Sequence, residues 1–303
     1  MYSISYYLKN PWSFVFGCMS KISPIIPAKL YLKIWYKSTF WYWPDFNNPK
    51  SFDEKIQRLK LNDHNPKYPP LIDKYLVKDI IAKKIWKEYI IPLLWVRDKF
   101  DDIDFDKLPK QFVLKCNHDS WSVIIVKDKS KFDKKAAKKK LDKALKFNYY
   151  NYAKERAYKF ITPKIIAEKY IIDNDTQELR DYKIYAFNGS ADYVMTCFDR
   201  QMKDTKFFYY DRNWNIKKEF SKDWLNYWDK IKLEKPKFLN KMFEFAETFS
   251  KDIPMVRVDF YEANWKLFFG ELTFYPGWWF DNTRPKAIEE YLTSKLVIKW
   301  WKK

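Results

Sequence analysis

Two apolar runs near the C-terminal end of the sequence constrain the fold more than any other part. They are "MVRVDFYE" (255–262) and "KLFFGELTF" (266–274), and the short link between them is turn-like around Asn264. Successive side chains of a strand point to opposite faces, so Arg257 and Asp259 share one face. The pattern predicts an antiparallel hairpin that carries charged groups on one side.

One carboxylate, Glu271, lies inside the second run. A turn centred near residue 265 places Asp259 opposite Glu271 and Arg257 opposite Thr273. Cross-strand Cβ atoms lie about 4.5–5.5 Å apart, and two carboxylates at that distance repel each other. A proton, Arg257 or a divalent cation can compensate, and such oxygen ligands suit Mg²⁺ bound together with phosphates. The alternative is an exposed face with an Arg–Asp pair and a solvated Glu271.

The other patterns indicate a mixed α+β protein. The chain has 303 residues, of which 21% are aromatic, enough for a sizeable core in one large or two smaller domains. Its first hundred residues are mostly helical in pattern, with capping-box spacing at "SFDE" (51–54) and helical periodicity over 71–85. Later helices and strands mix, which excludes a helical bundle or a β-sandwich. Strands are predicted within 90–98, 111–117, 122–128, 164–171, 181–189, 190–198 and 206–210, and helices within 132–147, 236–250 and 284–303.

Charge and cysteine content limit the classes of function. The net charge is +19, which attracts anions such as nucleotides, anionic lipids, acidic polysaccharides or nucleic acid. Three widely spaced cysteines and two histidines form neither a disulfide framework nor a zinc motif, and they suit a reducing compartment such as the cytoplasm. No window of about 18 apolar residues predicts a transmembrane helix.

Lysines interrupt several apolar segments. Lys115 lies in "QFVLKCN", Lys183 in "DYKIYAFNG" and Lys74 in "LIDKYLVKDII". An ammonium in an apolar strand needs an anionic partner, for which a phosphate is suitable, unless the strand ends there and the side chain reaches water. A further strand, "IIAEKYI", ends near Glu168 and can offer backbone groups to a nucleobase edge.

Together, these segments resemble the TupA-like family of the ATP-grasp superfamily, the teichuronopeptide-biosynthesis type. The resemblance spans roughly residues 27–283 and rests on several long motifs in the order usual for the family. The motifs are "NPKSFDEKIQRLKLND" (48–63), "LIDKYLVKDII" (71–81), "IIPLLWVRDKFDDIDFDKLPKQFVLKCNHDSW" (90–121), "IIAEKYI" (165–171), "DYKIYAFNG" (181–189) and "RVDFYEANWKLFFGELTFYPG" (257–277).

The resemblance implies an ATP-grasp fold, in which two α+β subdomains clamp ATP, here preceded by a mainly helical N-terminal region. It also implies ATP and Mg²⁺ as cofactors and amide-bond formation through an acyl-phosphate. The expected divisions are a helical segment at 1–68 and an ATP-grasp domain at 69–303, made of 69–110, a lid-like part at 111–180, a catalytic part at 181–283 and a C-terminal helix at 284–303.

Residue roles follow from the resemblance by position. Lys115 and Lys74 resemble the nucleotide-phosphate lysines of the family, and Lys183 occupies a further phosphate position. Arg257 is expected to stabilise the acyl-phosphate or tetrahedral intermediate, with Lys115 as a second catalytic residue. The remaining implied contacts are Glu168, Lys169, Tyr170 and Ile171 at the adenine hinge, Asp181 at the ribose, and Asp259, Glu271 and Thr273 at Mg²⁺.

The loop at 116–123 departs from the family pattern. Family members usually carry glycines there, whereas "CNHDSWSV" contains Asp119 and Trp121 and no glycine. Glycine lets a backbone approach phosphates closely, so this lid is expected to work differently, or the enzyme to be slow or inactive. The side chains that can still donate hydrogen bonds to ATP are His118, Ser120 and Ser122.

Related proteins join amino acids or other amines to uronic-acid carboxylates of bacterial surface polysaccharides. The resemblance therefore implies a uronic-acid-containing sugar nucleotide or polysaccharide and an amine as partners. The lysine-rich helix at 132–147 either binds such a glycan or forms a solvated face. Segments rich in Trp, Tyr and Lys at 32–43 and 295–303 either pack in the core or contact the cytoplasmic face of the inner membrane peripherally.

Two other functions compete with a ligase. A glycosyltransferase of the same pathway would use an Asp-x-Asp metal motif, and "DDIDFD" (101–106) has that spacing. A non-catalytic binder of nucleotide or acidic glycan would need only lysines and exposed aromatic side chains. No nucleic-acid recognition motif is visible in the sequence, so no nucleic-acid partner is expected.

Overall fold

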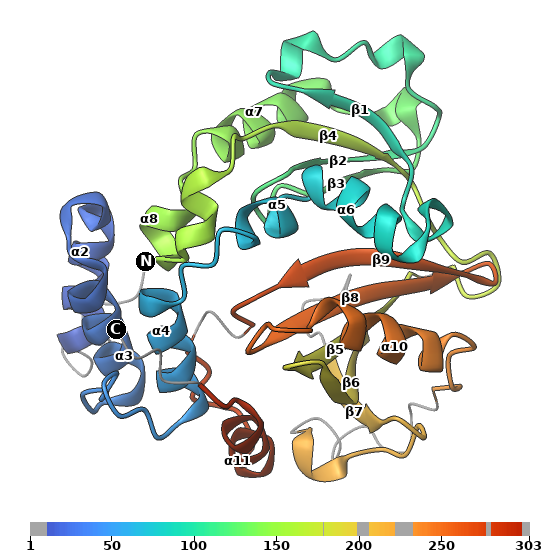
Figure 1. Cartoon of the computed structure of the whole chain (residues 1–303). Coiled ribbons are helices and arrows are strands. Elements are labelled where there is room, and N and C mark those ends of the chain that lie inside the picture. The colour runs from blue at the N-terminus through green and yellow to red at the C-terminus, as the bar shows by residue number, and fades with distance from the viewer. Residues whose placement is uncertain (1–10, 178, 199–205, 222–232, 277–279, 299–303) are drawn as a thin grey trace.

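The computed structural model describes residues 11–177, 179–198, 206–221, 233–276 and 280–298. Two antiparallel sheets lie one above the other in Figure 1, and a group of helices from the N-terminal part stands beside them. The predicted mixed α+β class is therefore confirmed.

The larger sheet has five strands in the order β7-β6-β5-β8-β9. Helix α10 (Leu239–Phe249) packs under it, and apolar side chains such as Ile184 and Val258 on that face join the main core with Phe243. The opposite face, toward the smaller sheet, carries the charged residues. The strands are β5 (Arg180–Phe187), β6 (Ser190–Phe198), β7 (Lys206–Asp211), β8 (Val256–Ala263) and β9 (Lys266–Thr273).

The smaller sheet has four strands in the order β1-β4-β2-β3. Helix α7 (Lys134–Leu145) covers its outer face, where Leu141 packs with Leu114 and Ala167 in a second core. β1 starts directly after Pro92 and lies at the sheet edge, as proline favours. The strands are β1 (Leu93–Arg97), β2 (Phe112–Cys116), β3 (Ile124–Val126) and β4 (Ile165–Lys169).

Helices connect and flank the sheets. The predicted helix at 71–85 is divided in two at Asp73, whose carboxylate accepts hydrogen bonds from the backbone N–H groups of Tyr75 and Leu76. The α-helices are α2 (Pro11–Lys21), α3 (Ala28–Phe40), α4 (Phe52–Asn62), α5 (Tyr68–Ile72), α6 (Leu76–Ile85), α8 (Tyr149–Ala153) and α11 (Lys286–Lys295). The 3₁₀ turns are η1 (Ser23–Ile25), η2 (Lys87–Tyr89), η3 (Phe100–Asp102), η4 (Phe105–Lys107), η5 (Lys129–Lys131), η6 (Arg156–Phe160) and η7 (Lys218–Phe220).

Helix α4 joins the N-terminal helices to the C-terminal helix α11. The predicted capping box is present, because Ser51 accepts from the backbone N–H of Glu54 and Glu54 accepts from that of Ser51. On the same helix, Asp53 pairs with Arg284 at 2.8 Å, and Arg284 also pairs with Glu289 of α11. Arg284 therefore compensates the buried charge of Asp53 at the junction.

The β8–β9 hairpin closes on a two-residue turn. Asn264 and Trp265 have φ of 50° and 62°, which is typical of a type I′ turn. Ala263 pairs with Lys266, so the turn centre lies half a residue before the position that the sequence predicts.

A bulge in β9 corrects this offset. The pairing passes from Phe260 with Phe269 to Asp259 with Glu271, so Gly270 has no partner of its own on β8. The bulge restores the predicted pairs, Asp259 with Glu271 and Arg257 with Thr273, which are confirmed. The candidate site therefore depends on a residue at 270 that tolerates the bulge.

Replacing Gly270 with Ala should destabilise the hairpin. A Cβ atom there would lie 2.9 Å from the carbonyl oxygen of Asp259 and 2.9 Å from the ring of Tyr261. We expect a loss of about 1–3 kcal/mol in the free energy of unfolding, measured by urea denaturation. Gly17→Ala is the matched control, because a Cβ there meets nothing within 4 Å. Equal losses for the two variants would contradict this account of the bulge.

Candidate functional site

Asp259 is the most buried charge on the inner face of the larger sheet. It is 1% exposed, and its carboxylate contacts Lys183 at 2.6 Å and Arg257 at 2.6 and 2.7 Å. Lys183 also pairs with Asp181 at 2.6 Å. Burial opposes the charge of Lys183, but Asp259 and Asp181 outweigh it and hold the pKa of this ammonium above its usual range. Lys183 therefore stays charged at neutral pH.

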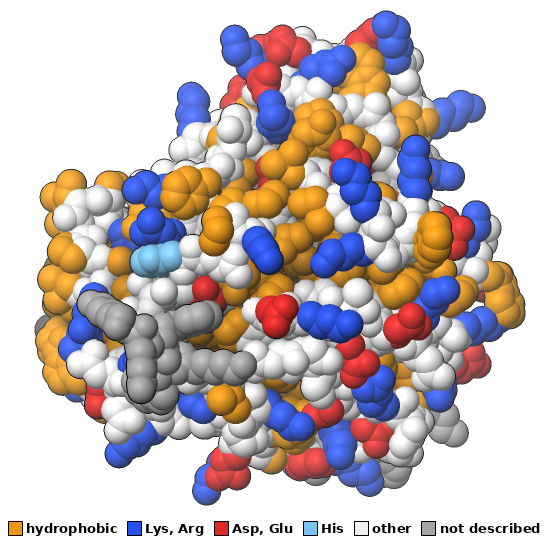
Figure 2. Space-filling view, in the orientation of Figure 1, with side chains coloured by type: hydrophobic (Ala, Val, Ile, Leu, Met, Phe, Trp, Pro, Cys, Tyr) orange, Lys and Arg blue, Asp and Glu red, His pale blue; other side chains and the backbone are white. Residues whose placement is uncertain are grey.

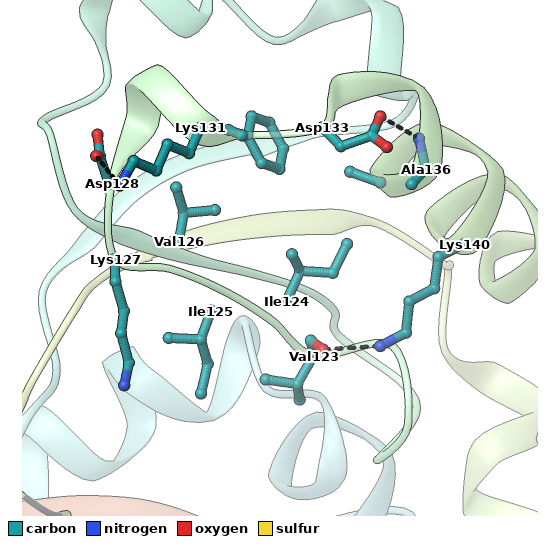
Figure 3. Close-up of a pocket in the computed structure, with 12 residues that line it drawn as sticks. Val123, Ile124, Ile125, Val126, Lys127, Asp128, Lys131, Asp133, Ala136 and Lys140 are labelled. Carbon is teal, nitrogen blue, oxygen red and sulfur yellow. Dashed lines mark hydrogen bonds and ion pairs between the residues drawn. The ribbon is translucent and has the colours of Figure 1, made fainter.

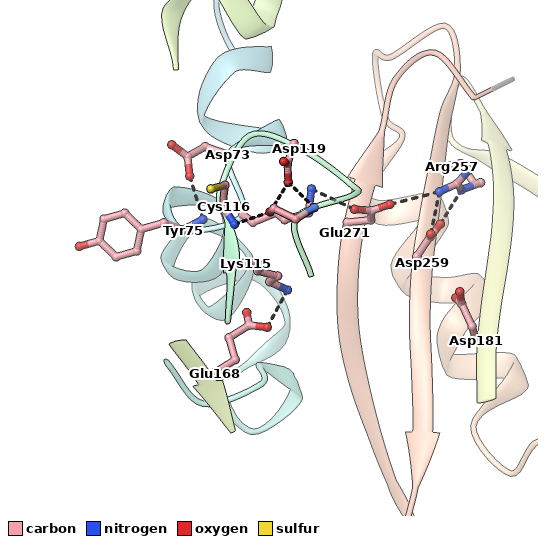
Figure 4. Close-up of polar contacts among 12 residues, drawn as sticks. Asp73, Tyr75, Lys115, Cys116, Asp119, Glu168, Asp181, Arg257, Asp259 and Glu271 are labelled. Atoms are coloured by element: carbon pink, nitrogen blue, oxygen red, sulfur yellow. Dashed lines mark hydrogen bonds and ion pairs between the residues drawn. The ribbon is translucent and has the colours of Figure 1, made fainter. Parts of the chain in front are cut away.

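Glu271 faces Asp259 across the hairpin and shares its arginine. Arg257 contacts Glu271 at 3.3 Å (Figure 4). Lys74, at the junction of α5 and α6, approaches the other carboxylate oxygen at 3.3 Å. Burial acts to raise the pKa of Glu271, but Lys74, Arg257 and Lys183 reverse this and lower it. Its side chain is 29% exposed, so it is more accessible than that of Asp259.

On the smaller sheet, Glu168 is a buried carboxylate that contacts two cationic side chains, as Asp259 does on the larger sheet. Its carboxylate contacts Lys115 of β2 and Lys78 of α6, each at 2.6 Å. The anionic partner that Lys115 needs is thus a carboxylate of this chain. Lys78 is a residue that sequence reasoning missed, although it lies in the quoted motif "LIDKYLVKDII", four positions after Lys74.

Asn117 fastens the loop after β2 to two other segments. Its side-chain amide donates to Asp73 at 2.9 Å and to the carbonyl of Thr162 at 3.0 Å, and it accepts from the backbone of Lys164 at 2.8 Å. The backbone N–H of Lys74 donates to the Asn117 carbonyl at 3.0 Å. Asn117 is fully buried, so these bonds position Lys74 against the smaller sheet.

The glycine-free loop is braced by its own side chains. Ser122 donates to Asp119 at 2.5 Å and accepts from the backbone N–H of Cys116 at 2.7 Å, which closes the loop on itself. The ring nitrogens of His118 lie 3.3 Å from Asn117 and 3.2 Å from the carbonyl of Phe147. Burial lowers the pKa of His118, which favours the neutral ring. Side-chain bonds thus hold the shape that the loop takes in this structure.

The segment that follows Glu168 is attached to the hairpin turn. The amide of Asn264 donates to the carbonyl of Ile172 at 2.7 Å, and its backbone N–H donates to Asp173 at 2.8 Å. The predicted adenine hinge therefore leads into a loop that the turn of the larger sheet holds. Of the remaining predicted site residues, Asp181 is buried, Tyr170, Ile171 and Thr273 are half-buried, and Lys169 and Ser120 are exposed.

The donor set fits a magnesium ion that arrives with phosphates. Among the described residues, no three His, Cys, Asp or Glu side chains gather in a group that could hold a metal ion. Asp259 and Glu271 still form a facing pair of carboxylates, with one oxygen of Glu271 toward Arg257 and the other toward Lys74. Mg²⁺ commonly takes one or two carboxylates and completes its shell with water and substrate phosphates, so two protein carboxylates suffice.

Other predicted features lie outside this cluster. A hollow of about 570 Å³ opens between β3 and α7, with Ile124 and Val126 on its floor and Lys140 at its rim (Figure 3). These floor residues pair with Leu114 and Phe112, on the face of the smaller sheet opposite Lys115. The hollow is therefore separate from the charged cluster.

The acidic motif at 101–106 and the basic helix face each other on the surface. Asp101 pairs with Lys138 of α7 at 2.6 Å, and Asp104 pairs with Lys107 at 3.1 Å. Helix α7 turns Leu141 into the core, and most of its lysines are exposed, as the solvated-face interpretation expects. The Asp-x-Asp spacing thus lies at the outer end of the smaller sheet, where these carboxylates contact lysines.

Replacing Glu168 with Gln should make the free energy of unfolding less dependent on pH under acidic conditions. Lys115 and Lys78 outweigh burial and lower the pKa of Glu168 from its ordinary value of 4.5. Its stabilising effect is therefore complete above that pH and is lost as pH falls through the lower folded-state pKa. We expect Glu168→Gln to cost about 3 kcal/mol at neutral pH and less at about pH 3, measured by urea denaturation.

The exposed Glu290, which pairs with Lys286 at 3.4 Å on α11, provides the control. Glu290→Gln should change the free energy of unfolding little at any pH. A parallel shift of the Glu168→Gln profile at every pH would contradict the ionic account of this pair.

Comparison with known proteins now places the chain. A family model described as TupA-like ATPgrasp matches residues 54–297. A D-alanine–D-alanine ligase from Bacillus anthracis is similar at 18% identity and TM-score 0.42, over 75% of this chain and 65% of that one. D-cycloserine synthetase DcsG is similar at 13% identity and TM-score 0.43, over 76% of this chain and 71% of that one. ATP-grasp ligase PsnB complexed with minimal precursor, Mg and ADP is similar at 9% identity and TM-score 0.42, over 93% of this chain and 75% of that one.

The chain spans just under two thirds of the length of the Bacillus anthracis ligase. The curated proteins include none that matches it. No helix among the described residues is long and apolar enough to cross a membrane. The family match covers most of the chain, including all but the first six residues of the motifs quoted above, and the predicted family and ATP-grasp fold are confirmed. The protein belongs to the TupA-like ATP-grasp family.

Proposed function

We propose that the chain is an ATP-dependent carboxylate–amine ligase that forms an amide through an acyl-phosphate. The observation that carries the proposal is the facing pair Asp259 and Glu271, held with Arg257 on one sheet while Lys74 reaches Glu271 from the other side. Carboxylates for a metal ion and cations for phosphates are thus combined in one place, which phosphoryl transfer requires.

The lysines around the cluster are the proposed phosphate contacts. Lys115 and Lys78 neutralise Glu168 here, and Lys183 neutralises Asp259 and Asp181. ATP would bring further negative charge to cations that are already in position, with its adenine at the hinge of Glu168 to Ile171 and its ribose at Asp181. When bound at Asp259, Glu271 and Thr273, Mg²⁺ would neutralise charge on the phosphates.

The proposed reaction has two steps. An oxygen of the substrate carboxylate attacks the γ-phosphorus, the bond to the ADP oxygen breaks, and Lys115 and Arg257 stabilise the charge that develops. The amine nitrogen then attacks the acyl carbon, and inorganic phosphate leaves as the amide forms. The proton lost by the amine passes to solvent. Arg257 also stabilises the oxyanion of the tetrahedral intermediate.

A pocket beside Arg257 is the proposed acceptor site. Tyr185 lies directly opposite Arg257 in the β5–β8 pairing and lines a cavity of about 200 Å³. Met195, Tyr209 and Phe220 line the same cavity. Aromatic side chains provide flat apolar surfaces on which a sugar ring can pack, so the lining suits a glycan carboxylate. Pro276 also lines this cavity, and residues 277–279 lie outside the described residues.

A uronic-acid unit of a bacterial capsule or surface polysaccharide is the proposed carboxylate, and an amino acid or another amine is the proposed nucleophile. The net charge of +19 favours an acidic glycan over a neutral one. The proposed location is the cytoplasm, with peripheral contact at the inner membrane, where lipid-linked glycans are assembled.

In the proposed division of the chain, β2 to β4 lie in the lid part and β5 to β9 in the catalytic part. Strand β1 belongs to the part at 69–110 but pairs with the sheet of the lid part.

Replacing Glu271 with Gln should abolish ATP-dependent turnover while the protein stays folded. The change removes one of the two proposed metal carboxylates at a partly exposed position. We expect at least about a hundredfold loss of phosphate release in assays with Mg-ATP, a panel of uronates and a panel of amines. Unchanged turnover would remove Glu271 from the metal site.

Glu290→Gln, at an exposed ion pair on α11, is the control for this assay and should leave phosphate release unchanged. Thermal-shift measurements with Mg-ATP separate two further outcomes. Stabilisation by Mg-ATP with no phosphate release for any substrate pair would identify a non-catalytic nucleotide binder. Sugar transfer that proceeds without ATP would identify a glycosyltransferase.

Replacing Tyr209 with Ala should weaken binding of the acceptor substrate but not binding of ATP. Tyr209 lines the pocket on β7, three strands away from β8, so its loss should leave the phosphate contacts intact. We expect KM for the active uronate to rise about tenfold, with KM for ATP nearly unchanged, in steady-state phosphate-release assays. A rise in KM for ATP instead would place this pocket in the nucleotide site.

A further inference from the structure

The N-terminal helices carry an apolar surface that the proposed ligase site does not explain. None of the residues of α2, all of which the structure describes, is buried, although the helix is mostly apolar. Figure 2 shows hydrophobic side chains gathered along the left edge of the molecule, over α2 and α3 of Figure 1. The exposed large apolar side chains of this surface, called here the N-terminal patch, are Phe14, Val15, Ile22, Ile25, Leu30, Trp41, Tyr42 and Trp43.

The patch is half of a longer exposed set. Of the 16 large apolar side chains exposed among the described residues, 8 lie between positions 14 and 43. Ile25 is 81% exposed and Ile22 52%, although Ile25 lies in the short helical turn η1 and Ile22 directly precedes it. Large apolar side chains that gather on one part of a surface indicate an interaction site rather than the scatter expected of a monomer.

The charges around the patch are of one sign. The first 44 residues contain five lysines and no aspartate or glutamate, although 39 of the 303 residues of the chain are acidic. The first acidic residue is Asp45. Lys21 and Lys29 are exposed among the apolar side chains. The segment that carries the patch therefore combines apolar side chains with lysines and has no acidic residue of its own.

Aromatic rings and a lysine are arranged together at one end of the patch. Trp12 and Trp43 meet edge to face with ring centres 5.1 Å apart, and the Lys37 ammonium lies 6.0 and 5.9 Å from those two rings. Trp41 and Tyr42 are about half exposed beside them. Tryptophan and tyrosine rings with nearby lysines are characteristic of protein surfaces at the headgroup level of a bilayer.

The patch rests on a firm base. Tyr31, Leu32, Trp35 and Tyr36 of α3 are buried and pack with Phe280 from the far end of the chain. Trp35 also contacts Tyr152 of α8. Leu32, Trp35 and Tyr36 belong to the 32–43 segment and pack in the core, which is one of the two interpretations of that segment, whereas Trp41 to Trp43 are exposed. Of the other segment with that pattern, 295–303, residues 299–303 lie outside the described residues.

We propose that the N-terminal patch docks the protein peripherally on an anionic membrane surface. Its apolar side chains would enter the boundary between headgroups and acyl chains, while its lysines face anionic headgroups. A second copy of the chain is a poorer partner, because a two-fold contact through this surface would bring the lysines of one copy close to the same lysines of the other. The proposal gives a surface to the membrane contact named under the proposed function but does not depend on ligase activity.

Vesicle flotation of the full chain tests the proposal without nucleotide or substrate. The vesicles are phosphatidylcholine alone, or phosphatidylcholine with phosphatidylglycerol as the anionic lipid. We expect binding to the anionic vesicles that falls as salt is raised, and weaker binding to the neutral ones. The double variant Ile22→Asp with Ile25→Asp should reduce binding to the anionic vesicles at least about tenfold.

The matched control is the double variant Phe160→Asp with Trp265→Asp. It also removes two exposed large apolar side chains, 60% and 71% exposed, and adds two negative charges, but outside the patch. The control should float like the natural chain. Equal loss of flotation for both variants would overturn the proposal, because net charge alone would then explain binding.

Two further results would overturn it. One is absence of flotation with anionic vesicles. The other is a concentration-dependent dimer, measured by light scattering, that the Ile22→Asp and Ile25→Asp changes abolish while vesicle binding is unaffected. Phosphate release by the same variants distinguishes this proposal from the ligase proposal, since loss of flotation with unchanged turnover supports the patch and leaves the ligase intact.

Discussion

The buried carboxylate of Asp259 is the constraint on which the rest of the structure depends. An ionised group with 1% exposure is costly unless charges and hydrogen bonds replace the water it has lost. Lys183 from β5 and Arg257 from its own strand provide these contacts. Their placement requires β5 beside β8 in the observed register, with Lys183 opposite Asp259. The sheet order and the polarity of its inner face follow from that need.

The same charges couple the two sheets. Lys74 approaches Glu271 on β9, while the backbone N–H of Lys74 is bound to Asn117 at the end of β2. Asn264, in the hairpin turn, holds the loop that follows β4. The sheets are therefore joined at two ends of the cluster by polar contacts rather than by one apolar core. Polar contacts can exchange partners when a charged ligand enters, so this construction is compatible with the proposed binding of ATP between the sheets.

The sequence allowed prediction where the signal was local. Strand alternation fixed which side chains of β8 share a face, and the capping box at Ser51 fixed the start of α4. The register of β8 and β9 came out right although the turn lies half a residue earlier, because the bulge at Gly270 makes up the difference. The carboxylate partner of Lys115 was not predictable, since Glu168 lies 53 positions later and the pairing of β2 with β4 decides the contact. Lys78 was missed for the same reason.

The glycine-free loop is held by side-chain bonds where the family pattern has glycines. A loop that must close over phosphates benefits from glycine, because its backbone can adopt more conformations. Here Ser122, Asp119 and Asn117 fix the backbone by side-chain bonds, so the loop loses little conformational freedom when a ligand binds. Such a preformed loop lowers the entropic cost of closure and limits how far the loop can adapt. In the proposed ligase, such a loop would accept few arrangements of the nucleotide. Its contacts on the phosphate side would be largely in place before the nucleotide binds.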